Sequence, residues 1–389
     1  MKGKPVIKSV EVHEFWYEVI NLGSDYNGFN SVYEPGAKKR DRTFALRIKT
    51  DQGIAGEYVG VGPSEAGQLS MFARYLIGKN ALEREKIYND VKRALRKYDK
   101  MAMGPVDIAL WDLAGKYYGC PVYELLGGFR TKLPTYASTY HGDNQPDGLN
   151  SPEAFADFAE QCLEMGYPAF KIHGWGDAPI EQEVANVHAV GKRVGGKMDL
   201  MIDPACEYNT FGDALKVGRA CDVEGFFWIE DPFKDGGVSQ YAHRKLRQLI
   251  KTPILQCEHV RGVEPKADFL IAEGTDYLRV DPIYDCGITG GIKIAHIAEG
   301  FGVDAEVHGA GPAQRHLMAA LRNSNYYELA LVHPKVPSRR ACWFTCGYND
   351  GLDSIDKNGC VSVPNGPGLG VQYNWPMIEK NRLGFTEYK

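Results

Sequence analysis

The sequence lacks several features that would assign a protein to a broad class. It has no apolar run of the roughly 18 residues that a membrane-crossing helix needs, and its amino-terminal stretch contains no apolar core of signal-peptide length. Basic residues are not in excess, since 45 Lys and Arg stand against 50 Asp and Glu, which argues against a nucleic-acid-binding face. The nine cysteines show neither CxxC pairs nor zinc-like spacing, as is typical of reduced thiols. We therefore expect a cytoplasmic protein whose partners include neither a membrane nor a nucleic acid.

The first third of the chain predicts an α+β domain, assigned to residues 1–128. Residues 6–19 and 43–60 have strand-like patterns, whereas residues 64–118 show the apolar spacing of helices. Between the strands, residues 21–40 are polar and rich in Gly and Tyr. This stretch is long for a structureless connection, so it is expected to form an irregular, functional loop.

The rest of the chain predicts a parallel (β/α)8 barrel, assigned to residues 129–345, so the fold class is α/β with an α+β cap. Eight strand-like runs alternate with helix-like segments that end at glycines. The runs cover residues 133–139, 168–174, 199–205, 225–231, 253–259, 277–282, 303–309 and 326–331. Residues 346–389 are Gly- and Pro-rich and are expected to return to the cap.

Three carboxylates occupy equivalent places in successive units of this predicted barrel. Asp203, Glu230 and Glu258 lie at the ends of the third, fourth and fifth strands. The carboxyl ends of barrel strands converge on one face, so these side chains should meet there. Three adjacent anions need a cation, and a hard divalent ion such as Mg²⁺ prefers oxygen ligands. The spacing therefore predicts a magnesium site.

Two longer segments resemble the enolase superfamily, specifically its mandelate racemase-like group. Residues 107–128, DIALWDLAGKYYGCPVYELLGG, resemble the family's segment between cap and barrel, and residues 280–295, VDPIYDCGITGGIKIA, resemble its sixth-strand segment. The order of cap, barrel and carboxy-terminal return also matches. The resemblance implies that the three carboxylates bind Mg²⁺, that the substrate is a small-molecule carboxylate held by the ion, and that the chain forms homo-oligomers, commonly dimers or octamers.

The chemistry implied by this family is removal of the proton next to a carboxylate. His308 on the seventh strand is the leading base, with Asp281 fixing its tautomer. Lys171 is expected to act as a second base on the opposite face, with a lowered pKa. Many members of the group carry Lys-x-Lys where this chain has Lys-x-His, so His173 is expected to contact the substrate carboxylate or its leaving hydroxyl. Glu328 matches a position that hydrogen-bonds the substrate carboxylate.

Further contacts are predicted with less support from pattern. His259 follows a ligand, His141 follows the first barrel strand, and Tyr26 and Asn27 lie in the long loop; each is a candidate substrate contact. A related dehydratase type places a base His two residues after the third-strand Asp. Here that position is Ala205, so that mechanism is not predicted.

The favoured activity is that of a lyase, a Mg²⁺-dependent dehydratase that converts an aldonate or aldarate to a 2-keto-3-deoxy acid. The resemblance supplies this expectation, and polar loop residues (Asn21, Asp25, Asn27 and Asn30) suit a polyol. A racemase or epimerase of a 2-hydroxy acid is the alternative, because bases on both faces serve either outcome. A noncatalytic sugar-acid binding protein is a third reading, and a barrel aldolase fits the fold alone.

Overall fold

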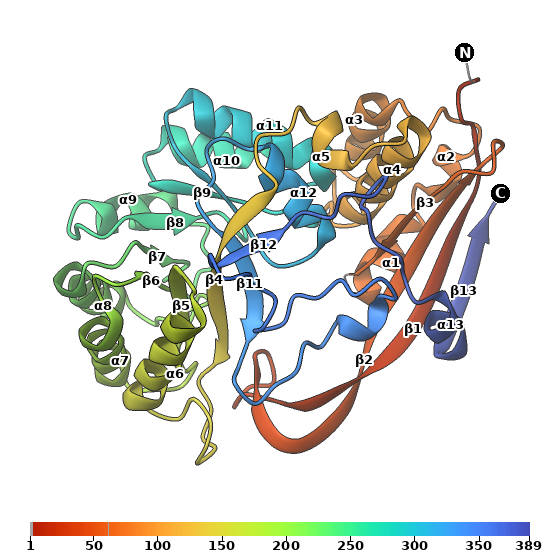
Figure 1. Cartoon of the computed structure of the whole chain (residues 1–389). Helices are drawn as coiled ribbons and strands as arrows, with labels where there is room; N and C mark the ends of the chain where they lie inside the picture. The colour runs from red at the N-terminus through yellow and green to blue at the C-terminus, as the bar shows by residue number, and fades with distance from the viewer. Residues whose placement is uncertain (1–2, 61) are drawn as a thin grey trace.

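The structure is a computed structural model that describes residues 3–60 and 62–389 (Figure 1). The chain first forms an antiparallel sheet covered by helices, then a ring of parallel strands, and finally returns to the first sheet (Figure 1). Within the described ranges, no helix is both long and apolar enough to cross a membrane.

The cap is built on a long hairpin. Its strands are β1 (Ile7–Ser24), β2 (Ser31–Thr50) and β3 (Ala55–Val59). Five helices follow: α1 (Pro63–Leu69), α2 (Ala73–Leu76), α3 (Arg84–Ala94), α4 (Met103–Tyr118) and α5 (Val122–Leu125). Helix α4 is buried over most of its length and ends at Gly119, whose φ of 76° is the left-handed conformation that a glycine adopts without strain.

Two carboxylates fasten α4 to the rest of the molecule. Asp107 accepts hydrogen bonds from the backbone and the hydroxyl of Thr289 in the barrel, and Asp112 accepts from the backbone of Glu57 and of Leu369. Both aspartates are buried, so these bonds provide the partners that buried polar groups need. Asp107 therefore joins the cap to the barrel, and Asp112 joins α4 to β3 and to the carboxy-terminal segment.

The prediction of an irregular loop at residues 21–40 was wrong. Strand β1 runs to Ser24 and β2 begins at Ser31, so only a short tip connects them. Leu22 and Tyr33 pair across the hairpin and are buried, and the Tyr33 ring stacks on His333 with centroids 4.6 Å apart. The strand signal was hidden because this burial comes from distant residues and because the register shifts between Ile20 and Leu22.

The barrel has the eight predicted parallel strands. They are β4 (Lys132–His141), β5 (Ala169–His173), β6 (Asp199–Ile202), β7 (Trp228–Glu230), β8 (Ile254–Gln256), β9 (Tyr277–Val280), β10 (Ala305–Val307) and β11 (Tyr327–Val332). Each strand from β4 to β9 pairs with the next one, and β11 pairs with β4. This arrangement confirms the predicted barrel with an amino-terminal cap.

Helices connect successive strands around the outside of the barrel (Figure 1). They are α6 (Pro152–Met165), α7 (Ile180–Val194), α8 (Phe211–Glu224), α9 (Gln240–Arg247), α10 (Val263–Ile271), α11 (Gly287–Gly300) and α12 (Pro312–Ala320). Local sequence explains their ends. In α8, Thr210 and Asp213 form a reciprocal capping box, and Gly225 ends the helix in the left-handed conformation.

The carboxy-terminal segment joins both parts of the molecule. It contains the 3-10 turn η1 (Ala341–Trp343), β12 (Cys360–Ser362), α13 (Trp375–Lys380) and β13 (Arg382–Tyr388). Strand β12 pairs with β4, whereas β13 pairs antiparallel with β1 at the edge of the cap sheet (Figure 1). At its other end, the cap hairpin touches the barrel where Val32 pairs with His141.

Burial of Glu306 on β10 gives a stability prediction. Burial raises its pKa to about 7, although Asn325 and Tyr326 donate hydrogen bonds to it. The folded chain therefore holds this proton between about pH 4 and pH 7 where the unfolded chain releases it, so stability falls as pH rises through that window. The free energy of unfolding should therefore fall between pH 5 and pH 8. In Glu306→Gln this fall is expected to be smaller by about 2–3 kcal/mol.

Urea unfolding of the two proteins at both pH values measures this effect. The exposed Glu164 supplies the control, since Glu164→Gln should leave the pH dependence unchanged. An equal loss of stability in the Glu306 variant and the parent would contradict the assignment.

Candidate active site

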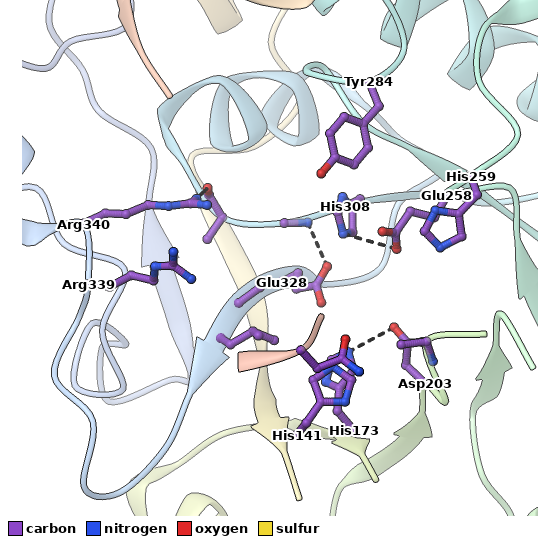
Figure 2. Close-up of a pocket in the computed structure, with 16 residues that line it drawn as sticks. His141, His173, Asp203, Glu258, His259, Tyr284, His308, Glu328, Arg339 and Arg340 are labelled. Carbon is purple, nitrogen blue, oxygen red and sulfur yellow. Dashed lines mark hydrogen bonds and ion pairs between the residues drawn. The ribbon is translucent and has the colours of Figure 1, made fainter. Parts of the chain in front are cut away.

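A cavity of about 380 Å³ opens at the carboxyl ends of the barrel strands (Figure 2). Seven of the predicted site residues line it: His141, His173, Asp203, Glu258, His259, His308 and Glu328. Asn30 from the tip of the cap hairpin also lines it, and its amide donates to Glu207 of the barrel at 3.2 Å. Cap and barrel therefore share the cavity.

The three predicted metal ligands come together at this cavity. Oxygen atoms of Asp203, Glu230 and Glu258 all lie within 4.8 Å of one another. Asp203 and Glu230 are buried, whereas Glu258 is partly open to the cavity. An all-oxygen set with one open side suits a hard divalent ion that also binds a substrate, so these residues fit Mg²⁺.

Two buried side chains, Lys171 and Arg279, compensate the negative charge of the acidic residues. Lys171 Nζ lies 3.1 Å from Asp203, 3.0 Å from Glu230 and 2.9 Å from Glu328. Arg279 Nε lies 2.5 Å from Glu230, and its Nη2 donates to Glu328 at 2.9 Å and to Glu230 at 3.1 Å. Burial alone would raise the pKa of Asp203 and of Glu328, but the neighbouring cations outweigh it and hold both well below their usual range.

Lys171 does not lie where the sequence placed it. It is absent from the cavity lining in the described part of the chain and is 1% exposed, with its ammonium enclosed by carboxylates. Burial would lower its pKa, but the charges of Glu230 and Glu328 overcome burial and raise the pKa well above its usual value, opposite to the fall predicted from a nearby Mg²⁺ and a cationic neighbour. A cation in this position balances the acidic cluster and is poorly placed to reach a substrate as a base.

We expect Lys171→Met to destabilise the metal-free protein by about 3 kcal/mol or more, because three buried carboxylates lose a counter-charge. Mg²⁺ should restore part of this loss by replacing the missing positive charge. Urea unfolding with and without Mg²⁺ measures both effects. In the control Lys216→Met, an exposed ion pair with Glu181 is removed, so little change is expected. Unchanged stability of the Lys171 variant would show that the cluster is neutralised in another way.

His308 and Asp281 form the predicted pair. The ring donates from Nδ1 to Asp281 at 2.5 Å, which directs Nε2 towards Glu258 at 3.3 Å. Burial on its own would lower the pKa of His308, but Glu258 and Asp281 outweigh it and raise the pKa to about 9. A divalent cation held by Glu258 would offset the charge of that carboxylate, which is the largest of the effects that raise this pKa.

His173 faces the cavity from β5, on the other side of Glu328 from His308 (Figure 2). Its Nε2 lies 3.1 Å from Asp203 Oδ2, and its ring is 5.0 Å from that of His141. Burial, reinforced by the charge of His173, lowers the pKa of His141 to about 3, so His141 is a neutral ring in this wall. Of the Lys-x-His pair, the histidine is the member that lines the cavity.

Of the remaining predicted substrate contacts, only some line the cavity. His259 lines the cavity, with Nε2 3.4 Å from Asp231. Tyr26 instead lines an adjoining groove that also includes His141, and Asn27 uses its side-chain oxygen to accept from the backbone of Phe29 within the hairpin tip. Neither loop residue lines the main cavity, because the tip turns its first residues towards the rim.

Four residues at the site were not identified from the sequence. Arg279 lies two residues before Asp281, and alternate residues of a strand share a face, so its position was available from the pattern. Tyr284 also lines the cavity, with its ring 5.7 Å from that of His308. Arg339 and Arg340 reach the cavity from the irregular segment after β11, where no periodic signal exists.

Comparison with known families decides the relationship. Residues 154–377 match the family described as enolase C-terminal domain-like, and residues 35–127 match the mandelate racemase / muconate lactonizing enzyme N-terminal domain. The chain belongs to the enolase superfamily. The two matches cover most of the cap and most of the barrel. Their order along the chain is the same as that of the cap and barrel predicted from the sequence.

Relatives within the enolase superfamily carry out more than one reaction. The structure of D-glucarate dehydratase from Agrobacterium tumefaciens complexed with magnesium is 30% identical, with a TM-score of 0.86, and the match covers 97% of this chain and 99% of that one. D-gluconate dehydratase of Thermoproteus tenax is 28% identical over 74% of this chain, a match spanning 57% of that protein. N-succinyl-L-Arg/Lys racemase of Bacillus cereus is 24% identical over 67% of this chain and 70% of its own length. Sugar-acid dehydratases and racemases thus both occur among the relatives.

Proposed function

We propose that the chain is a Mg²⁺-dependent sugar-acid dehydratase that forms a 2-keto-3-deoxy acid. The observation that carries this proposal is the His308–Asp281 pair facing a polar cavity beside Asp203, Glu230 and Glu258. Dehydratases among the relatives add support, including one whose structure holds magnesium.

The residues divide the proposed reaction between them. His308 takes the proton from the carbon next to the substrate carboxylate, and Asp281 stabilises the imidazolium that results. When bound by the three acidic ligands, Mg²⁺ would supply positive charge at the substrate carboxylate, where negative charge develops. In this proposal His173, which lines the cavity across Glu328 from His308, gives a proton to the departing β-hydroxyl (Figure 2). The enol released by loss of water then tautomerises to the 2-keto acid.

Polar side chains in the cavity suit a polyol. Asn30, His141, His259 and Tyr284 offer hydrogen-bonding groups along its walls. A cavity of about 380 Å³ is also at the small end of the range for small-molecule sites, as a sugar acid requires.

The test is incubation of the protein with Mg²⁺ and a stereochemically complete set of aldonates and aldarates, with semicarbazide detection of 2-keto-3-deoxy products. Product that disappears with EDTA supports the proposal. The absence of product from every acid of both types would overturn it.

An epimerase or racemase of a 2-hydroxy acid is the second candidate. It is favoured by the presence of His308 and His173 on different sides of Glu328 and by the racemase among the relatives (Figure 2). Incorporation of deuterium at the α-carbon from D2O, with inversion and without keto-acid formation, would distinguish it from dehydration.

A further inference from the structure

The cavity has two chemically different ends. Asp203 and Glu258 lie at one end, and Arg339 and Arg340 lie at the other, with Glu328 between them (Figure 2). The acidic end suits a cation and, through it, one carboxylate of a substrate. The guanidinium end has the opposite charge and so suits a second anionic group of the same molecule.

The two arginines differ in how far their charges are already compensated. Arg339 donates to Asp41 at 2.6 Å and to the hydroxyl of Tyr17 at 3.4 Å, so its charge is paired within the cap. In the part of the chain that the structure describes, Arg340 has a hydrogen bond to the carbonyl of Ala310 at 3.2 Å but no ion pair with a carboxylate. Arg340 thus contributes an uncompensated positive charge to the cavity wall.

The acidic residue beside Arg340 is already engaged. Asp350 shares an adjoining small pocket with Arg340, but its Oδ1 accepts hydrogen bonds from Arg315 at 2.5 Å and from the Tyr327 hydroxyl at 2.8 Å. The guanidinium of Arg340 therefore keeps donors for a ligand. Its planar fork matches the two oxygens of a carboxylate.

We propose that the substrate is a sugar diacid, an aldarate, whose distal carboxylate binds Arg340 while its first carboxylate lies at the acidic end. This inference rests on the proposed function and specifies its substrate class. An aldonate would place an uncharged hydroxymethyl group beside the guanidinium and would leave its charge uncompensated. A phosphorylated aldonate would also bring an anion there, but one unpaired guanidinium matches the single charge of a carboxylate better than a phosphate dianion.

The experiment compares acids of matched configuration: D-glucarate with D-gluconate, galactarate with D-galactonate, and 6-phospho-D-gluconate as the phosphate probe. In the parent protein with Mg²⁺, kcat/KM for the reactive aldarate should exceed that for its aldonate by about 30-fold or more, because charge-assisted bonds to an anion are strong. Arg340→Gln should lower the aldarate value by about 30-fold while changing aldonate turnover less than about threefold. Arg340→Lys should retain part of the selectivity.

The matched control is Arg322→Gln. Arg322 is an exposed arginine that pairs with Glu299 before β11, away from the cavity, so its replacement should leave the selectivity unchanged. Turnover limited to aldonates, or preference for the phosphorylated acid, would overturn the inference and leave dehydration intact.

Failure of the proposed function gives a different result. If no acid turns over, calorimetric binding of the same pairs in Mg²⁺ decides the inference separately. Tighter binding of the diacids that is lost in Arg340→Gln supports it. Equal binding of diacid and monoacid overturns it.

Discussion

His308→Asn is expected to reduce the rate of α-proton removal by about 10³-fold or more, because the general base is lost. Asparagine keeps a polar side chain of similar reach, so it is expected to preserve folding and the acidic cluster. The effect should appear both in 2-keto-3-deoxy acid formation and in exchange of the α-proton with D2O, measured by NMR. Mg²⁺ binding should persist, since His308 is not one of the three carboxylates.

Asp281→Asn is the companion variant for this pair. It keeps a hydrogen-bonding partner for Nδ1 of His308 but removes the negative charge, so activity should fall and the pH dependence of kcat should change while folding persists. Substantial α-proton exchange in His308→Asn would show that the base is another residue, with His173 the first to test because it also faces the cavity.

Glu258→Gln is expected to weaken Mg²⁺ binding by about 100-fold and to reduce turnover by a comparable or larger factor at fixed Mg²⁺, because an anionic ligand becomes neutral. Glu258 is the least buried of the three carboxylates and has no bond to Lys171 or Arg279 among the described contacts. Its replacement should therefore test metal binding without removing a contact of Lys171 or Arg279, although it also removes the carboxylate 3.3 Å from Nε2 of His308.

Calorimetric titration of Mg²⁺ measures this change. Glu264→Gln is a suitable control, since this exposed carboxylate on α10 pairs with Lys92 outside the site. Equal Mg²⁺ affinity in the Glu258 variant and the parent would remove this residue from the ligand set. High Mg²⁺ concentrations should recover part of the activity if the ligand assignment holds.

The barrel and the meeting of the three carboxylates were predictable because they follow from repetition. Each strand ends at the same face, so Asp203, Glu230 and Glu258 needed only the right strand boundaries to come together. The positions of His308 and Asp281 follow from the same repeat.

The roles of the two residues in Lys-x-His were harder to separate. Lys171 and His173 are two apart on β5 and share a face; chain direction makes Lys171 the deeper one, but the pattern alone cannot say whether it still reaches the cavity. Depth along the barrel axis decides it: the earlier residue lies among Glu230 and Glu328, and the later one reaches the cavity. That difference depends on strand tilt and stagger, which a single sequence does not specify.

The residues that the cap contributes to the site could also not be predicted from local sequence patterns. The hairpin tip acquires its position from contacts across the chain, such as Tyr33 with His333 and Asn30 with Glu207. Arg340 lies in an irregular segment after β11, next to Arg339, which pairs with Asp41 of the cap. Sequence periodicity describes regular elements, and the arginine end of this cavity is built from a segment without it.

The pairing of β13 with β1 has a consequence for the order of assembly during synthesis. β1 leaves the ribosome before the barrel, whereas its edge partner, with pairs such as Val12 with Thr386, is made after the barrel. Until then this edge of the cap sheet has unpaired backbone groups and is open to association with other chains. Chains cut short before residue 382 should therefore be prone to aggregate, even when every predicted catalytic residue has already been made.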